Sequence, residues 1–147
     1  MKDENTKRHS STVYIVRHGR TDLNQARVLQ GRSDWPLNET GIRQAKEAAD
    51  RLQGIQFDHV FTSPLMRAVQ TARMISPDTP MITDNRLMEM DYGPYEGSSL
   101  EKPAPEILHF FSDFVDNPAP EGMESLEDVA GRMADFMEEI RGVHAEN

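Results

Sequence analysis

The stretch VYIVRHGRTDLN (residues 13–24) joins an apolar run directly to charged and hydroxylated side chains. Residues 13–16 are β-branched or aromatic, which is typical of a buried strand. Two arginines, a histidine and a threonine follow at the point where this strand would end. Ligands of parallel sheets bind at the carboxyl ends of the strands, so the stretch predicts both a strand and a ligand site.

Strands and helices alternate along the rest of the chain. The pattern predicts strands at residues 59–62 and 81–83 and helices at residues 41–52, 63–76, 106–115 and 125–140. Serine is a good N-cap and proline suits the first helical position, so Ser63 and Pro64 are expected to begin their helix. The alternation indicates parallel pairing and an α/β fold, layered α/β/α around a mostly parallel sheet.

The length of 147 residues predicts one domain. Residues 1–12 are polar, with no apolar stretch behind them, and are expected to be a disordered lead-in rather than a signal peptide. Residues 13–147 are expected to form the domain, and no stretch is apolar over the length of a transmembrane helix. The lack of cysteine excludes disulfides and cysteine nucleophiles and suits a reducing compartment, so a cytoplasmic location is expected.

The net charge of −9 is unevenly distributed. Residues 1–83 hold 12 Lys and Arg against 9 Asp and Glu, whereas residues 84–147 hold 4 against 16. The acidic second part would repel a polyanion, so a nucleic acid or an anionic membrane is not expected as partner. The arginines of the first part suit a small anion that is bound locally.

The residues after the first strand suit phosphoryl transfer. His18 can attack phosphorus through one ring nitrogen when a hydrogen bond holds the other nitrogen. Arg17 and Arg20 are close enough in sequence to reach the phosphoryl oxygens, which the planar guanidinium fits in pairs. Thr21 and Asn24 can add neutral hydrogen bonds.

Two other residues, which come later in the chain, complete this chemistry. Arg67 lies one turn into the predicted helix after TSPL and can return toward the strand edge. Glu89, between two methionines in LMEMDYG, is the candidate proton donor if apolar surroundings raise its pKa. Each of these residues alone is more often structural or on the surface, and only their combination indicates a phosphoryl-transfer site.

Five segments, in order over most of residues 13–140, resemble motifs of the histidine phosphatase superfamily, which is also called phosphoglycerate mutase-like. They are VRHGRTDLN (16–24), LQGRSDWPLNETGIRQA (29–45), VFTSPLMRAVQTA (60–72), LMEMDYGPYEG (87–97) and PEGMESLEDVAGRM (120–133). The resemblance implies the phosphoglycerate mutase-like version of the layered α/β fold.

The resemblance also implies roles for individual residues. It makes His18 the phosphorylated nucleophile, Arg17 and Arg67 the ligands of the phosphoryl oxygens, and Glu89 the proton donor and acceptor. The other candidate substrate-binding residues are Arg20, Thr21, Asn24, Gln30, Gly31 and Tyr92. The family needs no metal, and neither a metal nor a cofactor is expected here.

The family's second catalytic histidine has no clear match. It ends a later strand in a V-x-H-G-like string, whereas RGVHAEN (residues 141–147) contains Val143 and His144 without a following glycine or a preceding apolar strand. We therefore expect a helix end there and a sheet without the family's C-terminal strands. Either the natural protein continues past Asn147 or it is a shortened member of the family.

Three functions remain open from the sequence. The leading one is a phosphomonoester phosphatase, in which His18 takes the phosphoryl group of a small phosphorylated metabolite and water releases it. The second is a phosphoglycerate mutase, although the segment between Glu89 and Ser125 is short for one and a mutase needs a bisphosphate for priming. The third is a non-catalytic phosphate-binding module, if the chain ends at Asn147.

The substrate itself is not readable from the sequence. Aromatic residues between positions 94 and 124 either contribute a wall that selects the substrate or belong to the core. The spacing of Ile107, Phe110, Phe111 and Phe114 is what a helix would use to pack on the sheet. A homodimer formed through an unpaired sheet edge is a further possibility.

Overall fold

The computed structural model describes residues 10–145, with side chains as far as Gly142. Its helices and strands are α1 (Asp22–Gln25), α2 (Glu39–Arg51), β1 (Val60–Thr62), α3 (Met66–Ile75), β2 (Met81–Thr83), η1 (Asn85–Leu87), η2 (Gly93–Tyr95), α4 (Pro105–Ser112) and α5 (Leu126–Ala145). Most of the expected lead-in, residues 1–9, lies outside this range, and residues 10–12 are exposed and neither helical nor in a strand.

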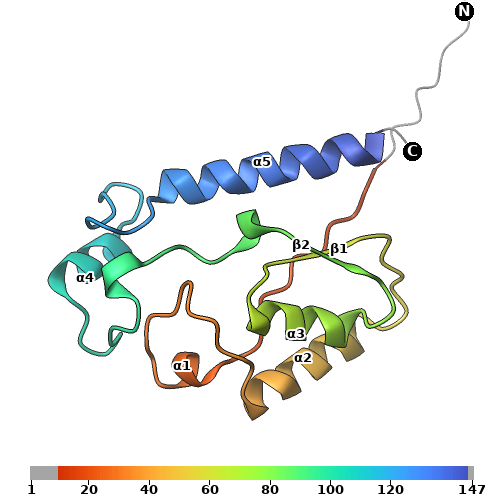
Figure 1. Cartoon of the computed structure of the whole chain (residues 1–147), viewed down its shortest axis with the longest axis horizontal. Helices are drawn as coiled ribbons and strands as arrows, with labels where there is room; N and C mark the ends of the chain where they lie inside the picture. The colour runs from red at the N-terminus through yellow and green to blue at the C-terminus, as the bar shows by residue number, and fades with distance from the viewer. Residues whose placement is uncertain (1–9, 146–147) are drawn as a thin grey trace, which may run out of the picture.

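The sheet of the described residues consists of β1 and β2, which pair in parallel. Val60 is opposite Met81, and Thr62 is opposite Thr83. α3 and α2 lie on one side of this pair and α5 on the other (Figure 1). Phe136 of α5 contacts Phe61 of β1 edge to face, with ring centroids 5.3 Å apart. The mixed α/β fold, the parallel pairing and both later strands were predicted correctly.

Residues 13–16 do not form the predicted buried strand. They belong to no strand or helix, and the side chain of Ile15 is 91% exposed. A strand is held by hydrogen bonds to a neighbouring strand, and within residues 10–145 neither β1 nor β2 pairs with this segment. The prediction was wrong because β-branched composition favours an extended chain but supplies no partner for it.

The predicted helix at residues 41–52 is present as α2. It begins at Glu39 because the side chain of Asn38 caps it, with Oδ1 accepting a hydrogen bond from the amide of Gly41 at 2.9 Å. Gly54 follows the helix at a φ of +85°, a left-handed conformation that glycine adopts without strain. Gly54 therefore stands at the predicted stop.

α3 is present, but Ser63 and Pro64 do not begin it. The helix starts at Met66, and the Ser63 hydroxyl accepts only a long bond, 3.3 Å, from the amide of Leu65. The carboxylate of Asp34 caps the helix instead, since its Oδ1 accepts from the Met66 amide at 2.7 Å. The capping prediction was wrong because a side chain from a distant loop reaches the first amide of the helix.

The last two helices differ from their predicted lengths. α4 ends at Ser112 rather than residue 115, because Asp113 Oδ1 accepts from the amides of Val115 and Asp116 and so favours a turn. α5 continues beyond residue 140 to Ala145. Residues 141–145 are thus helical, as expected for the stretch that contains His144, whose side chain lies outside the described part.

The main apolar cluster packs between loops and α4 rather than on the sheet. It consists of Leu29, Met90, Tyr92, Ile107 and Phe110, all at most 8% exposed. The helix α4 therefore buries two of its apolar side chains against the segments that carry Gly31 and Glu89. This core fixes the position of both segments relative to each other.

Candidate active site

Contacts with α2 and α3 hold Gly19 and Arg20 in place. The Gly19 amide donates to Thr71 Oγ1 of α3 at 3.1 Å. A Cβ on Gly19 would lie 2.4 Å from the carbonyl oxygen of Gly41, so only glycine permits this close packing. Gly19 thus allows the His18 loop to lie directly on α2, and the expected meeting of distant segments is observed.

The imidazole of His18 is half-buried and its orientation is fixed by its neighbour. Nδ1 lies 2.6 Å from the carbonyl oxygen of Gly19. A carbonyl oxygen can only accept, so Nδ1 carries the proton and donates it, and Nε2 holds a free lone pair. Burial lowers the pKa of His18, and the charges of Arg67 and Arg17 lower it further, against the Gly19 bond and the Glu89 charge, which raise it.

Arg67 is a buried cation beside this histidine. Its side chain donates from NH2 to the carbonyl oxygen of Gly31 at 2.6 Å and from NH1 to that of Ser33 at 2.9 Å. The residue is 2% exposed, and burial lowers the pKa of Arg67, while Glu89 raises it. Among the described residues no carboxylate forms an ion pair with this guanidinium, and the charges of Glu89, Glu96 and Asp34 act on its pKa from further away.

Arg17 and Glu89 flank the same place from the surface. Both side chains are exposed, and both charges act on the pKa of His18. Glu89 Oε1 accepts a hydrogen bond from the amide of Met90 at 2.8 Å, and the apolar enclosure expected around this carboxyl group is not present. The structure therefore brings together the predicted group of Arg17, His18, Arg67 and Glu89.

Tyr92 forms the inner wall of the candidate site. It is 8% exposed within the main apolar cluster. Burial raises the pKa of Tyr92, and the charges of Glu89 and Glu96 raise it further, so the phenol carries its proton. The charges of Arg67 and Arg17 also act on it, which places this ring close to the cations.

Thr21, Asn24 and Gln30 bond mainly to one another. Thr21 and Asn24 form a capping box around α1, and Thr21 Oγ1 donates to Gln30 Oε1 at 2.6 Å. Thr21 is fully buried and Gln30 is 8% exposed. The structure gives all three a direct role in shaping the loop, which the sequence did not distinguish from a role in binding.

Gly31 and Arg20 are placed differently from each other. A Cβ on Gly31 would lie 2.3 Å from the carbonyl oxygen of Met90, so this glycine lets two loops touch. The Arg20 side chain is exposed, and its backbone amide donates to Gln44 Oε1 at 2.9 Å. Arg17 and Arg67, rather than Arg20, are the arginines whose charges shift the pKa of His18.

Glu96 was missed by the sequence reasoning as a residue that builds the site. Its carboxylate accepts from the amide of Gly31 at 2.9 Å, and from the amide and hydroxyl of Ser33 at 3.1 and 2.5 Å. The carbonyl groups of Gly31 and Ser33 in turn hold Arg67. The motif position of Glu96, just before Gly97, was the available signal.

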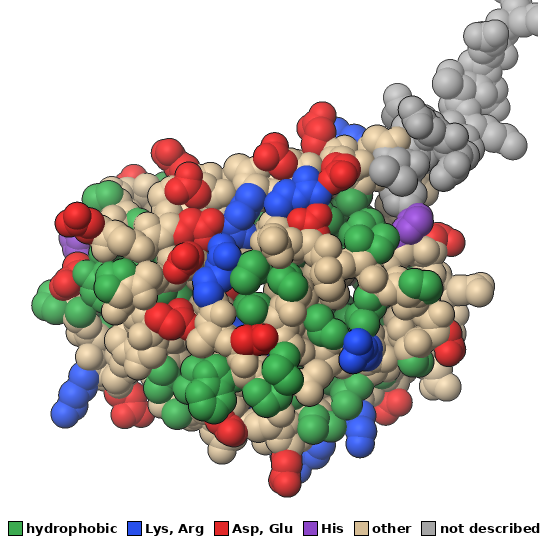
Figure 2. Space-filling view, viewed as in Figure 1, with side chains coloured by type: hydrophobic (Ala, Val, Ile, Leu, Met, Phe, Trp, Pro, Cys, Tyr) green, Lys and Arg blue, Asp and Glu red, His purple; other side chains and the backbone are tan. Residues whose placement is uncertain are grey.

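The described residues contain no group of three or more His, Cys, Asp or Glu that could hold a metal ion. No helix among them is long and apolar enough to cross a membrane. Figure 2 shows Asp and Glu side chains spread over one face of the molecule, with Lys and Arg side chains in a line among them.

Comparison with known families assigns this arrangement. A sequence model of the histidine phosphatase superfamily (branch 1) matches residues 13–147. The chain belongs to the histidine phosphatase superfamily. The family expected from the five motifs is therefore confirmed.

Individual relatives within this superfamily carry phosphatase and mutase names. A protein of Hydrogenobacter thermophilus, provisionally named phosphoserine phosphatase 2, is 35% identical over 92% of this chain and 69% of its own length. A protein of Yersinia pestis, provisionally named phosphoglycerate mutase GpmB, is 39% identical over 82% of this chain and 59% of its own length. The alpha-ribazole phosphatase of Shigella flexneri has a similar structure, with a TM-score of 0.77 and 26% identity over 88% of this chain and 67% of that one.

The histidine phosphatase chain described here thus spans between about three fifths and two thirds of the length of these relatives. Their names are those of phosphatases and a phosphoglycerate mutase, which is consistent with enzyme activity in the superfamily. The substrates in those names belong to those proteins.

Proposed function

We propose that this chain carries the phosphoryl-accepting centre of a phosphomonoester phosphatase. The observation that supports this most directly is the hydrogen bond from His18 Nδ1 to the Gly19 carbonyl, 2.6 Å long, which leaves Nε2 unprotonated. The cations Arg17 and Arg67 lie close enough to shift the pKa of the same ring. A nucleophilic nitrogen beside two cations is the arrangement that phosphoryl transfer requires.

In the first step the Nε2 lone pair attacks phosphorus, a nitrogen–phosphorus bond forms, and the ester oxygen–phosphorus bond breaks. Arg17 and Arg67 stabilise the charge on the non-bridging oxygens as it redistributes. The departing oxygen takes a proton from the carboxyl group of Glu89, which leaves the Glu89 carboxylate and a free alcohol.

In the second step a water molecule attacks phosphorus, and the nitrogen–phosphorus bond breaks. The Glu89 carboxylate accepts the proton of the water, which restores its acid form, and Nε2 regains its lone pair. Inorganic phosphate leaves, and the cycle consumes one phosphomonoester and one water. No metal or cofactor is needed to balance it, so we expect excess chelator to leave turnover unchanged.

A small phosphorylated metabolite is the proposed substrate class. The named substrates of relatives, among them phosphoserine, phosphoglycerate and an alpha-ribazole phosphate, are small phosphomonoesters. The chain's net charge of −9 opposes nucleic acid and anionic membranes as partners. We also propose a cytoplasmic location, which fits the absence of cysteine and is tested by cell fractionation.

The direct test replaces the nucleophile. We expect His18→Ala to abolish release of phosphate from a small phosphomonoester, while circular dichroism and the melting temperature stay close to those of the parent chain. His109→Ala is the matched control, since His109 lies on the exposed face of α4. Equal turnover by the His18 variant and the parent would contradict the nucleophile assignment.

A phosphoglycerate mutase is the second candidate, favoured by the 39% identity to the GpmB-named protein. A mutase returns the phosphoryl group to a bound acceptor and needs priming by a bisphosphate, whereas a phosphatase transfers it to water. Interconversion of 2- and 3-phosphoglycerate that depends on added bisphosphate would select the mutase. Phosphate binding without any turnover would select the non-catalytic module.

A further inference from the structure

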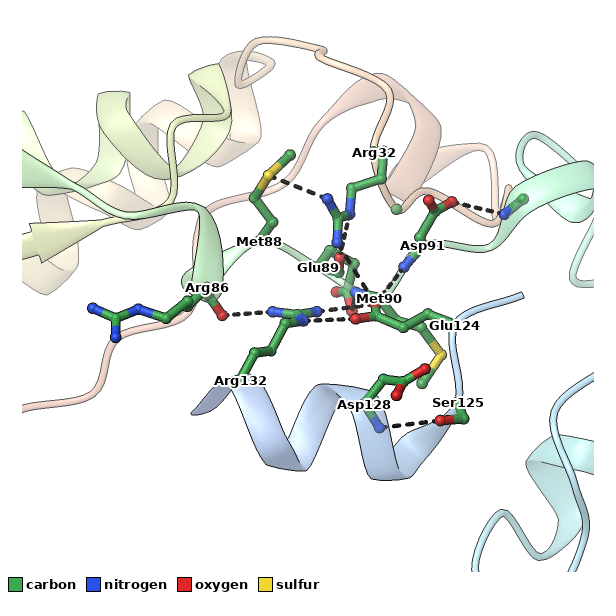
Figure 3. Close-up of polar contacts among 12 residues, drawn as sticks. Arg32, Arg86, Met88, Glu89, Met90, Asp91, Glu124, Ser125, Asp128 and Arg132 are labelled. Atoms are coloured by element: carbon green, nitrogen blue, oxygen red, sulfur yellow. Dashed lines mark hydrogen bonds and ion pairs between the residues drawn. The ribbon is translucent and has the colours of Figure 1, made fainter. Parts of the chain in front are cut away.

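The loop that carries Glu89 is held from outside rather than by its own secondary structure. Between η1 and η2, residues 88–92 form no helix or strand. Arg32, from the loop after Gln30, and Glu124, from the segment before α5, bond to the backbone of this loop, and Arg132 of α5 bonds to the backbone of η1 just before it (Figure 3). None of these three residues belongs to the group proposed above to contact the phosphoryl group.

Glu124 forms two hydrogen bonds with the backbone of Asp91. Its Oε2 accepts from the Asp91 amide at 2.9 Å, and its own amide donates to the Asp91 carbonyl at 2.8 Å. The next residue, Ser125, caps α5, with its hydroxyl accepting from the Asp128 amide at 3.0 Å. The start of α5 is therefore fixed to the backbone two residues after Glu89.

Arg132 makes this connection rigid. Its Nε and NH2 donate to the two carboxylate oxygens of Glu124 at 2.7 and 3.1 Å, a paired arrangement that fixes both side chains. Its NH1 donates to the Arg86 carbonyl at 2.5 Å. The Arg132 bond lowers the pKa of Glu124, and the two side chains are only 16% and 13% exposed. The pair is thus charged and largely shielded from solvent.

Arg32 holds the centre of the loop. Its Nε donates to the carbonyl oxygen of Glu89 itself at 2.9 Å, and its NH2 lies 3.6 Å from Glu124 Oε2. One cluster therefore bonds to the backbone at Arg86, Glu89 and Asp91, on both sides of the candidate proton donor. A contact that only docked α5 would not need to reach the Glu89 carbonyl.

We infer that Glu124, Arg132 and Arg32 form a positioning cluster that holds the Glu89 carboxyl group within reach of the leaving oxygen. The inference rests on the proposed function and adds the residues that act through Glu89. Proton transfer requires donor and acceptor within hydrogen-bond distance, so a loosened loop lowers the rate before it lowers binding. The cluster should therefore matter most for substrates whose leaving oxygen needs a proton.

The test compares two substrates. Glu124→Gln keeps the shape of the side chain but turns an amide toward Arg132. We expect its kcat/KM for ethyl phosphate to fall about 10- to 100-fold, part of what a positioned general acid contributes, because the ethoxide must be protonated as it leaves. For p-nitrophenyl phosphate, whose leaving group departs without a proton, kcat/KM should stay within about threefold of the parent value.

Three further comparisons make the result specific. Glu127→Gln removes an exposed carboxylate three residues further along and should change neither substrate. Arg132→Lys keeps the charge but cannot reach both Glu124 and the Arg86 carbonyl, so it should reproduce the ethyl phosphate loss even if Glu124→Gln folds poorly. In a chain that already carries Glu89→Gln, Glu124→Gln should cause no additional loss, because it acts through that carboxyl group.

Two outcomes would overturn the inference alone, and two others would overturn the proposed function on which it rests. Equal losses of kcat/KM for both substrates would show that the cluster only stabilises the structure and does not act on proton transfer. Additive losses with Glu89→Gln would show that Glu124 does not act through Glu89. Turnover that survives His18→Ala, or a parent chain without turnover, would instead contradict the proposed function and remove the inference with it.

Discussion

Single side chains set the charge balance at the candidate site. The protonated Nδ1 of His18 faces the Gly19 carbonyl, so Nε2 holds a free lone pair, and the charges of Arg67 and Arg17 act on the same ring. Arg67 is buried against carbonyl oxygens, which neutralise a cation less well than a carboxylate does. The site therefore combines a neutral nucleophile with two cations, Arg17 and Arg67, which favour binding of a phosphoryl group.

The His18 ring should titrate below its ordinary value of 6.5, because burial and two nearby cations disfavour the imidazolium. We expect the midpoint of its ring-proton NMR shift to lie below pH 6.5 and to return to about 6.5 in denaturant. Since the unfolded chain takes up this proton first, the group lowers stability as pH falls below 6.5. A midpoint at or above 6.5 in the folded chain would contradict the described environment.

The residue types of the site were predictable from the sequence, but the hydrogen bonds that hold them in place were not. Arg17, His18, Arg67 and Glu89 each stand out by chemistry within a short motif. Glu96 and Asp34 act by accepting backbone amides from segments more than thirty residues away, which no local pattern reveals. The same holds for Glu124, whose partner amide lies thirty-three residues earlier.

Helices and loops position the site by close packing of backbones. α2 approaches residues 19 and 20 so closely that a Cβ on Gly41 would lie 2.1 Å from the Arg20 carbonyl oxygen. α3 contributes Arg67 and Thr71, and Thr71 Oγ1 accepts from the Gly19 amide while donating to the Arg67 carbonyl at 2.8 Å. The position of the His18 loop thus depends on the start of α2 and the first turns of α3.

Gly41→Ala should therefore lower the free energy of unfolding by about 1–3 kcal/mol, because the new methyl group overlaps the Arg20 backbone. Gly131→Ala is the matched control in α5, where a Cβ would meet no atom within 4 Å. That variant should raise the free energy by about 0.5–1 kcal/mol, the usual gain in a helix. Urea denaturation measures both, and equal effects of the two variants would contradict the close packing.

The ends of the helices were less predictable from the sequence than their presence. The periodic apolar residues of α2, α3 and α5 identified these helices, but their ends depend on caps. Asn38 caps α2 locally and is a recognisable signal, whereas Asp34 caps α3 from another loop. The sequence left open whether the apolar residues of α4 line a substrate-selecting wall or pack on the sheet. In the structure, Ile107 and Phe110 pack in one cluster with Leu29, Met90 and Tyr92.

The whole molecule is two packed regions joined by extended segments (Figure 1). One region holds β1, β2, α2 and α3, and the other is the loop and α4 cluster around Phe110, with α5 running along both. Residues 13–16 remain outside either core, with side chains between 44% and 91% exposed. The exposure of these apolar residues was the largest departure from the predicted buried strand, although the sequence had already indicated a sheet without the family's C-terminal strands.

Ile15→Lys should leave the free energy of unfolding within about 0.5 kcal/mol of the parent value, because the side chain is 91% exposed. A loss of several kcal/mol would instead mean that this segment is buried. Sedimentation of the same pair of proteins tests the homodimer that the sequence left open: a dimer held by the exposed residues 13–16 should dissociate in the variant.

The most direct measurement of the central claim is the site of phosphorylation. The chain is mixed with a small phosphomonoester, quenched in alkali, digested and examined by mass spectrometry. The proposed function predicts a phosphoryl group on the peptide that contains His18, stable in alkali and lost in acid, as expected for a nitrogen–phosphorus bond. Phosphate on another residue, or turnover without any phosphohistidine on that peptide, would contradict it.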